Sequence, residues 1–189
     1  MQAIALVGLP RCGKDTAADY LVKKYGFSKV VMSDENGFEL RKQGLKDDKR
    51  GRCRMGKELR EKFGMDVVAS RSFERAKKEG FEKVVFVGAR NIEEVDLFKK
   101  GISGFKVVKI ESGKGERLGR ISSFSVKDKK GNVATVKEAE TDEKYFEREA
   151  WEREKYGLGK VLDAADYTIE NNSTIAEFEK AIDELMQKL

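Results

Sequence analysis

The sequence predicts an α/β fold, in which a parallel β-sheet carries helices on both faces. Short apolar runs alternate with amphipathic helical segments along the 189 residues, which is typical of parallel strands joined by helical crossovers. A glycine-rich turn separates the first apolar run from the first helical segment. The length is that of one compact domain, so we expect a single domain over residues 1–189.

The first expected elements are a strand at 3–7 and a helix at 16–25, joined by a turn that reads Val-Gly-Leu-Pro-Arg-Cys-Gly-Lys-Asp-Thr. Two glycines in the turn permit backbone angles and a close approach that a Cβ would prevent. The loop N–H groups and the helix start then face one point, where the helix dipole favours an anion. The lysine adds a charge that can reach the β- and γ-phosphates. The turn therefore predicts a phosphate-binding loop, whose candidate nucleotide-binding residues are Gly8, Pro10, Arg11, Cys12, Gly13, Lys14, Asp15 and Thr16.

Composition narrows the function. The chain contains no histidine, which excludes Ser-His-Asp, Cys-His and His-ligated metal chemistry. The absence of histidine does not argue against phosphoryl transfer, because that reaction relies on Lys, Arg and Mg²⁺ to neutralise charge. The net charge is +5, and a modest positive field suits a phosphate-rich substrate.

The same composition sets the expected partners and location. Two cysteines imply no disulfide framework and fit a cytoplasmic protein. We expect no signal peptide and no membrane span, because no apolar run approaches 18 residues. Aromatic residues are not interleaved with basic ones as a nucleic-acid stacking platform requires. We therefore expect a small-molecule substrate, no nucleic acid, and either a monomer or a homodimer.

A second strand is expected at 29–32, and a polar cluster at 33–36 follows it and caps the next helix. Asp34 lies in that cluster, at the carboxyl end of a strand, where ligands of open α/β sheets bind. The residue types leave two roles open for Asp34, which are a plain N-cap and a contact with the substrate. Residues 36–50 read as polar and interrupted, and two helical stretches are expected to follow, one through Phe63 and one at 65–78.

The second half continues the alternation. We expect a strand at 83–87, a helix at 92–100, a strand at 105–110 and a helix at 111–120. The last of these puts Arg117 and Arg120 on one helix face. Residues 122–137 read as a β-hairpin that turns near 130–132.

Three further elements close the chain. Residues 141–156 read as an amphipathic helix that carries Arg148 and Arg153. A last short strand is expected before Asn171. The final segment, 175–189, reads as a helix with an apolar packing stripe made of Ile175, Phe178, Ile182 and Leu185.

The sequence Gly-Lys-Asp-Thr at 13–16 resembles the phosphate loop of adenylate kinases and other nucleoside monophosphate kinases, and also that of phage-type deoxynucleoside monophosphate kinases. The resemblance implies a P-loop kinase fold with strand order 2-3-1-4-5, and ATP and Mg²⁺ as cofactors. It also implies that Thr16 contacts phosphate or metal. Asp15 is either a first-turn acid stabilised by the helix dipole or a holder of a metal-bound water. Residues 34–80 would form a helical acceptor-binding insert, and 112–156 a lid region.

Residues 88–95 and 157–171 resemble an archaeal family of kinase-like P-loop proteins, through Gly-Ala-Arg-Asn-Ile-Glu-Glu-Val and through a Gly-x-Gly turn followed by an Ala-Asp pair. The resemblance implies that Arg90 binds the acceptor phosphate. It also favours Arg148 as an arginine that faces the active site. The resemblance to nucleotide kinases implies that Arg117 and Arg120, with Arg148, neutralise the transferring phosphoryl group, and that Asn171 borders the adenine. Further candidate phosphate anchors in the insert are Arg41, Arg54 and Arg60.

One position departs from the adenylate kinase pattern. Val87 stands where those kinases carry the Asp that follows the third strand. Mg²⁺ would then be held by Thr16, nucleotide oxygens and water, which suits a cation that keeps several waters.

The sequence thus leads to ATP-dependent phosphoryl transfer onto a small phosphorylated acceptor, a nucleoside or deoxynucleoside monophosphate. One alternative is a dephospho-coenzyme A kinase, whose acceptor is a ribose hydroxyl and in which Asp34 would act as a base. The other is a nucleotide-binding regulatory module with little transfer, which would signal through the hairpin at 122–137.

Overall fold

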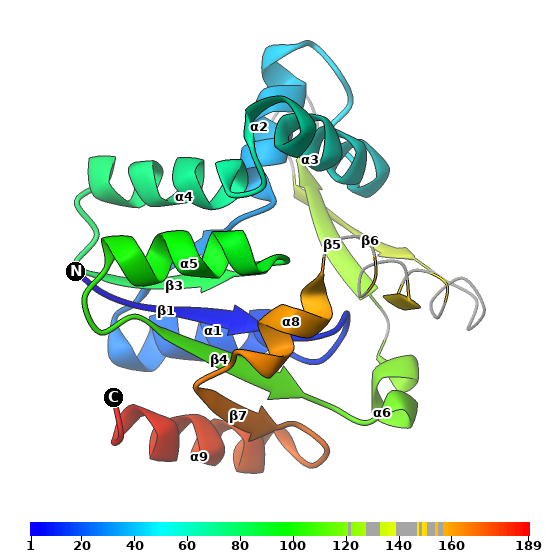
Figure 1. The fold of residues 1–189 in the computed structure, drawn as a ribbon. Helices are drawn as coiled ribbons and strands as arrows, with labels where there is room; N and C mark the ends of the chain where they lie inside the picture. Colours follow the sequence, from blue (N-terminus) through cyan, green and yellow to red (C-terminus); the bar gives the residue numbers. More distant parts are fainter. Residues whose placement is uncertain (121, 128–132, 139–146, 148, 151–153, 155–156) are drawn as a thin grey trace.

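The computed structural model describes residues 1–120, 122–127, 133–138, 147, 149–150, 154 and 157–189. Helices and strands alternate along most of this length (Figure 1). In chain order the elements are β1 (Gln2–Val7), α1 (Lys14–Tyr25), β2 (Ser28–Val31), α2 (Asp34–Lys42), α3 (Lys49–Phe63), α4 (Val67–Lys78), β3 (Lys83–Val87), α5 (Ile92–Gly101), β4 (Lys106–Glu111), α6 (Lys114–Gly119), β5 (Ser122–Lys127), β6 (Val133–Glu138), α8 (Leu158–Asp163), β7 (Tyr167–Glu170) and α9 (Ile175–Met186).

Five strands form one parallel sheet in the order β2-β3-β1-β4-β7. This confirms the predicted α/β class and the predicted strand order, since β7 is the fifth strand of the sheet. The phosphate loop follows the central strand, so it lies in the middle of the edge where the parallel strands end.

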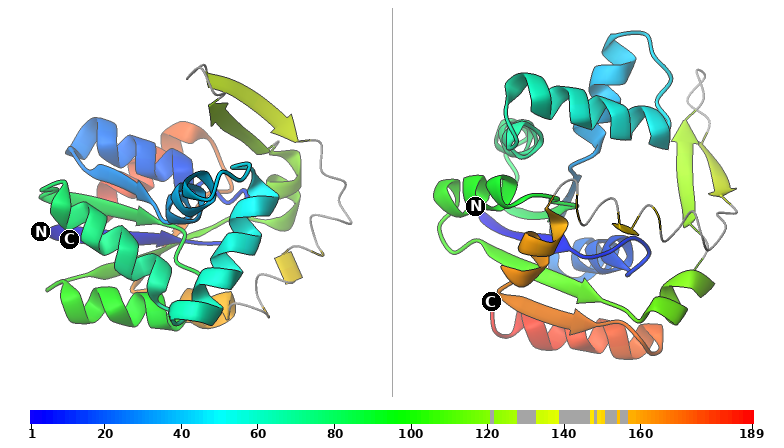
Figure 2. Two further views of the ribbon diagram at one scale, coloured as in Figure 1. Left: turned by 90° about the horizontal axis from the view of Figure 1, so that it is seen from above. Right: turned by 45° about the vertical axis from the view of Figure 1, so that its right-hand side comes forward.

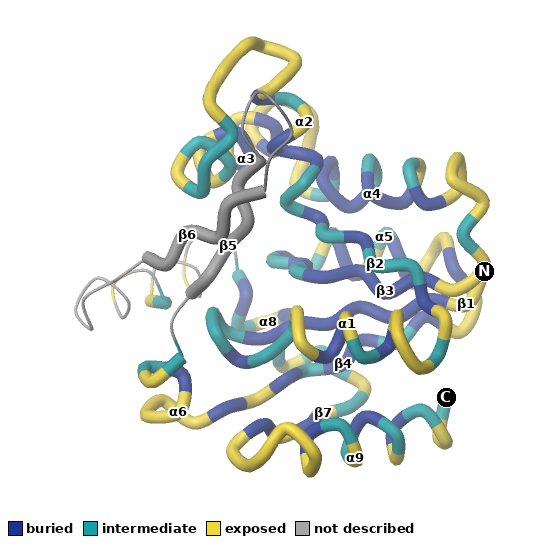
Figure 3. The backbone as a smooth tube through the Cα atoms, turned by 180° about the vertical axis from the view of Figure 1, so that it is seen from behind, coloured by how far each residue is buried: buried dark blue, intermediate teal, exposed yellow. Residues whose placement is uncertain are grey.

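Helices cover both faces of the sheet because its strands are apolar on both sides. In β1, Ala3, Ala5 and Val7 pack into a core with α3, α4, α5 and α8, while Ile4 and Leu6 pack into a second core with α1 and α9. The two cores appear as buried stretches on either side of the sheet (Figure 3). The sheet is therefore the middle of three layers.

The additions to this three-layer core lie at the carboxyl ends of the strands. Helices α2 and α3, the β5–β6 pair and α6 all stand on that side of the molecule (Figure 2). Strands β5 and β6 pair antiparallel, as expected for the hairpin. The predicted turn near 130–132 lies outside the described residues, and so does most of the predicted helix at 141–156, including Arg148 and Arg153.

The structure corrects expectations for three segments between residues 33 and 120. Residues 34–42, which read partly as interrupted, form helix α2, and Ser33 rather than Asp34 is its N-cap. The strand β4 extends to Glu111, which pairs with Glu170, so the next helix begins later, at Lys114. Arg120 follows this helix in extended conformation and is not on a shared helical face with Arg117.

Two expectations near the C-terminus also change. Residues 158–163 form the short helix α8, where a Gly-x-Gly turn was expected. Ile175 is 59% exposed at the start of α9, whereas Phe178, Ile182 and Leu185 are buried. The packing stripe therefore begins one turn later than predicted, because the first turn of α9 extends past the edge of the core.

We predict that Phe98→Ala lowers the free energy of unfolding by about 3–5 kcal/mol. The Phe98 ring is fully buried and stacks on the rings of Phe86 and Phe105, with centroids 4.3 and 5.1 Å apart. Urea unfolding followed by circular dichroism measures the change. The control is Ile175→Ala at the exposed end of α9, expected to shift the unfolding free energy by less than about 0.5 kcal/mol.

Candidate functional site

The turn between β1 and α1 has the backbone geometry of a phosphate loop. Gly8 and Gly13 have φ of 151° and 104°, and Arg11 between them has φ of 61°. Lys14 folds back over the loop, and its Nζ donates to the carbonyl oxygens of Gly8 and Leu9, both at 2.9 Å. The ammonium is thus held in the loop by two neutral acceptors, which a phosphate can replace.

The residues of the loop fit a nucleotide phosphate. A Cβ on Gly8 would lie 2.4 Å from the Ile110 carbonyl oxygen and 2.6 Å from the Cys12 Sγ, so only glycine allows this close approach. The first turn of α1 has N–H groups without i−4 partners in the helix, and these point to the space above the loop. Together with Lys14 they supply the donors that a phosphate requires.

Asn171 and Arg120 brace this loop from the neighbouring strand ends. The buried Asn171 side chain donates from Nδ2 to the Cys12 carbonyl at 2.9 Å. Arg120 donates from Nη1 to the Arg11 carbonyl at 3.2 Å and to Ser112 Oγ at 3.1 Å, and from Nη2 to the Asn171 carbonyl at 2.8 Å. Arg120 therefore lies beside the loop, as its predicted role requires, while the Asn171 amide is engaged by the loop backbone.

Arg117 has a different environment from Arg120. Its side chain is buried, its Nε donates to the Ser112 carbonyl at 2.9 Å, and its Nη1 pairs with the Glu149 carboxylate. This pair joins α6 to the segment that follows the hairpin. Arg148, the third arginine predicted for the transferring group, lies outside the described residues.

Asp15 and Thr16 are both exposed in the first turn of α1. Asp15 Oδ1 lies 2.8 Å from Lys29 Nζ, and Asp19 Oδ1 lies 3.0 Å from the same nitrogen. Desolvation opposes the charge of Lys29, but its hydrogen bonds to the two carboxylates outweigh this and raise its pKa. Asp15 thus forms a surface ion pair in the first turn of α1, and its two predicted roles both stay predictions.

Asp34 is positioned by an arginine that sequence reasoning did not single out. Arg52 on α3 donates from Nη1 to Asp34 Oδ1 at 2.7 Å, and its Nε and Nη2 form a fork with the Asp47 carboxylate. The pKa of Asp47 is lowered, chiefly by its hydrogen bonds from Arg52. No local sequence signal reveals this contact, because Asp34 and Arg52 are 18 residues apart on different helices.

The three insert arginines named from the sequence do not converge. Arg41 pairs with Asp47, and the exposed Arg54 lies 3.6 Å from Glu58 one turn away. Arg60 is buried and donates to Glu94 at 2.7 Å. Arg41 and Arg54 thus take part in surface pairs, and Arg60 in a core pair.

Arg90 stands in the turn after β3, next to the central strand. The turn is tied to β1 by a hydrogen bond from the Gly88 N–H to the Leu6 carbonyl at 3.2 Å. The backbone N–H of Arg90 donates to Glu94 Oε2 at 2.7 Å.

Val87 occupies the position at which adenylate kinases carry an Asp, and its side chain is buried in the core. Within the described residues, His, Cys, Asp and Glu side chains nowhere gather in threes as a protein-made metal site would require.

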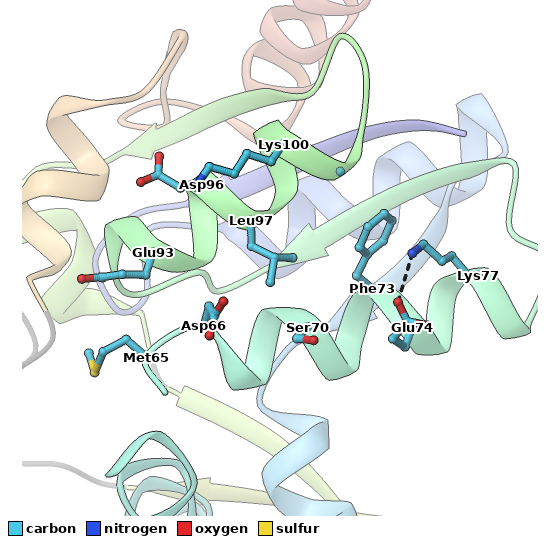
Figure 4. A pocket seen from close by; sticks show the side chains of 11 residues that line it. Met65, Asp66, Ser70, Phe73, Glu74, Lys77, Glu93, Asp96, Leu97 and Lys100 are labelled. Carbon is cyan, nitrogen blue, oxygen red and sulfur yellow. Dashed lines mark hydrogen bonds and ion pairs between the residues drawn. The ribbon is translucent and has the colours of Figure 1, made fainter. Parts of the chain in front are cut away.

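A separate groove of about 670 Å³ lies between α4 and α5 (Figure 4). Its lining mixes acidic and basic side chains over the Phe73 ring, and no residue of the phosphate loop contributes to it. We place the chemistry at the loop instead, because there two glycines with positive φ, the start of the 12-residue helix α1 and the folded-back Lys14 meet at the end of the central strand. None of the helices among the described residues has the length and apolar character that a membrane crossing requires.

Sequence comparison identifies relatives of unassigned activity. No family model matches the chain. The UPF0200 protein of Sulfurisphaera tokodaii is 34% identical over 191 residues, covering 100% of this chain and 98% of that protein. The UPF0200/UPF0201 protein of Archaeoglobus fulgidus is 32% identical over 194 residues, and there this chain spans 56% of the relative's length.

Structural comparison shows the fold of P-loop kinases. TT1252 from Thermus thermophilus superposes with a TM-score of 0.59 at 16% identity, covering 100% of this chain and 97% of that one. Shikimate kinase from Acinetobacter baumannii, solved in complex with shikimate, has a TM-score of 0.56 at 20% identity, with coverages of 100% and 94%. These comparisons confirm the expected P-loop kinase fold, and the finer likeness to nucleotide kinases stays a prediction.

We predict that Gly13→Ala and Asn171→Ala are strongly non-additive. A Cβ on Gly13 would lie 2.3 Å from Asn171 Nδ2, so Gly13→Ala should cost about 1–3 kcal/mol through this clash and its positive φ. Removing the Asn171 side chain relieves the clash, so the double variant should be more stable than the sum of the single effects by about 0.5–3 kcal/mol. Urea unfolding of the four proteins measures the cycle, and strict additivity would contradict the contact.

Proposed function

We propose that this protein, which belongs to the UPF0200 family, transfers the γ-phosphoryl group of Mg-ATP to a small phosphorylated acceptor. The acceptor we propose is a nucleoside or deoxynucleoside monophosphate. The observation that carries the proposal is the loop itself, in which Lys14 folds back over a turn with two positive-φ glycines at the end of the central strand. A lysine and a ring of backbone donors at this point suit the β- and γ-phosphates of a nucleotide.

On the donor side, Lys14 would exchange the Gly8 and Leu9 carbonyls for phosphate oxygens. The exposed Thr16 hydroxyl would hold Mg²⁺, and Asp15 would hold a metal-bound water only by leaving its ion pair with Lys29. Bound Mg²⁺ would neutralise charge that develops on the phosphates. Of the arginines proposed to neutralise the transferring group, Arg120 is already beside the phosphate loop, because its guanidinium contacts the Arg11 carbonyl.

Arg117 and Arg148 complete the proposed set. Arg117 would have to exchange its Glu149 partner for phosphate, which fits a group that engages only when a nucleotide is bound. Residues 112–156 would then act as the lid. Asn171 would border the adenine through its position at the end of β7, with its amide engaged by the loop.

On the acceptor side, the insert at 34–80 and the β3 turn supply the candidate contacts. Arg90 would bind the acceptor phosphate, and Arg52 would join it as a second guanidinium at this edge. Arg52 is charged at its ordinary pKa, and its hydrogen bonds to Asp47 raise that pKa further. A guanidinium forks onto phosphate better than an ammonium does.

A second candidate, a dephospho-coenzyme A kinase, is favoured by the position of Asp34. This carboxylate follows β2, is partly exposed and is oriented by Arg52. Such a group suits an acceptor hydroxyl, whose proton must leave during transfer. A monophosphate acceptor has no such need, since its attacking oxygen is already anionic.

The first test is ADP release from Mg-ATP, coupled to an NADH readout, across ribo- and deoxynucleoside monophosphates and dephospho-coenzyme A. We expect turnover with one acceptor class, and Lys14→Ala should lower it by about 100-fold or more, because the lysine stabilises charge on the transferring group. Lys23→Ala, an exposed lysine on the same helix, is the control. A Lys14→Ala protein with full transfer would refute the proposal. ATP binding with no acceptor-dependent turnover would favour the regulatory module.

Asp34→Asn separates the two kinase candidates in the same assay. The substitution keeps the side-chain shape but removes the base. We expect a loss of about 10²-fold or more in kcat if the acceptor is a hydroxyl, and less than about 10-fold if it is a monophosphate. Asp47→Asn weakens the same arginine fork without touching a base, so equal losses in both variants would show that Asp34 acts through structure alone.

A further inference from the structure

Glu94 is fully buried in the first turn of α5, and each of its carboxylate oxygens has a different partner. Oε2 accepts from the backbone N–H of Arg90 at 2.7 Å. Oε1 accepts from Nη2 of Arg60 on α3, also at 2.7 Å. The carboxylate therefore bridges the turn that carries Arg90 and a helix of the insert.

Helix capping explains only half of this arrangement. Asn91 is the N-cap of α5, and its Oδ1 accepts from the Glu94 N–H at 2.9 Å. In an ordinary capping box the acid at this position reaches back to the N-cap N–H. Here Glu94 reaches one residue further, to the N–H of Arg90, and its second oxygen accepts from Arg60, which is 34 residues away in sequence.

The buried Arg60–Glu94 ion pair carries a desolvation cost that capping of α5 alone would not require. The side chains of both residues are almost completely buried, and taking two charges out of water is unfavourable unless their geometry and further hydrogen bonds are good. Arg60 also donates from Nη1 to the Gly56 carbonyl at 3.1 Å, which fixes the guanidinium to its own helix. The pair is thus a rigid link between α3 and α5.

The turn at 88–91 is held from a second direction as well. Asn91 Nδ2 donates to the Met65 carbonyl at 3.0 Å, in the connection between α3 and α4. At the other end of the turn, the Gly88 N–H donates a hydrogen bond to the Leu6 carbonyl in β1. Arg90 therefore stands between the strand that leads into the phosphate loop and the helices that form the insert.

We propose that Glu94 is a positioning residue that couples α3 to the backbone of Arg90, so that the insert sets where Arg90 meets the acceptor. Arg60 then acts through Glu94 and not as a phosphate anchor. The catalytic consequence rests on the proposed function, in which Arg90 binds the acceptor. The structural link between α3 and the Arg90 backbone does not rest on that function. The link and its effect on the acceptor are therefore tested by separate readouts.

The variant is Glu94→Gln, which keeps the shape of the side chain. Both of these partners are donors, so the new amide NH₂ must oppose one of them. The charged Arg60 guanidinium is the stronger donor and takes the remaining amide oxygen, so the hydrogen bond from the Arg90 N–H is the one that is lost. Its control is Asp183→Asn. That carboxylate also accepts hydrogen bonds from other elements, in this case three from Tyr20, Tyr25 and Lys24, but it joins α1 to α9.

The first readout is hydrogen exchange of the Arg90 amide, followed by two-dimensional NMR. Loss of a hydrogen bond to a charged acceptor should speed exchange at Arg90 by about 10-fold or more in Glu94→Gln. Asp183→Asn should leave it within about twofold, because local openings are governed by nearby bonds. Unchanged Arg90 exchange in Glu94→Gln would overturn the link, whatever the activity.

The second readout is the acceptor dependence of turnover. Glu94→Gln should raise the acceptor KM by about 10-fold or more, while the KM for ATP stays within about twofold, because only the acceptor contact depends on Arg90. An equal rise in Asp183→Asn would overturn the coupling. If the wild-type protein turned over no acceptor, the proposed function would fail, and Arg90 exchange alone would decide the link.

A second variant guards against a Glu94→Gln protein that does not fold. Arg60→Met combined with Glu94→Gln removes both charges, and replacing a buried pair in this way is often neutral or stabilising. The glutamine oxygen is then free to accept from Arg90, so exchange at Arg90 should return to within about threefold of wild type while the acceptor KM stays raised. A wild-type acceptor KM in this folded double variant would overturn the coupling.

Discussion

The contact between Asn171 and the phosphate loop is the constraint on which the site depends. The amide donates to the Cys12 carbonyl, and its nitrogen lies so close to Gly13 that no Cβ fits between them. This fixes the strained turn before any ligand arrives, so the ordering cost is met at folding rather than at binding. The contact requires the end of β7 to reach the loop after β1, although the two strands are separated by β4 and by most of the chain.

The sheet order satisfies that requirement. With β4 between β1 and β7, the Asn171 N–H bonds to the Glu111 carbonyl at 2.7 Å and its side chain extends past the end of β4 to the loop. Arg120 then closes the same corner by contacting Arg11, Ser112 and Asn171. The last strand and the start of the proposed lid thus meet on one loop, which would place the lid in direct contact with the proposed phosphate site.

Local signals predicted the fold and the loop. The strands are short apolar runs, and the glycine spacing of the loop reflects backbone angles that other residues rarely adopt, so both can be read from a single stretch of chain. The Asn-x-x-Glu pattern at 91–94 is also local, and it could have identified Glu94 as a capping residue. Ile175 was predicted to pack but is exposed, because helical periodicity cannot show where a helix extends beyond the core.

The partners of the arginines could not be predicted in this way. Arg52 meets Asp34, and Arg60 meets Glu94, through the packing of separate helices, and a guanidinium looks the same in sequence whether it anchors a ligand or neutralises a core acid. The structure shows that the two arginines differ in burial. Arg60 is enclosed with its acid, whereas Arg52 stays partly exposed in its pairs with Asp34 and Asp47.

Titration calorimetry of nucleotide binding is the most direct test of the proposed phosphate site, which should be formed before any ligand binds. We predict that Mg-ADP binds the wild-type protein once per chain, and that Asn171→Ala weakens the affinity by about 10-fold or more, because binding must then also order the loop. No heat of binding by a folded wild-type protein, or an affinity unchanged by Asn171→Ala, would contradict it.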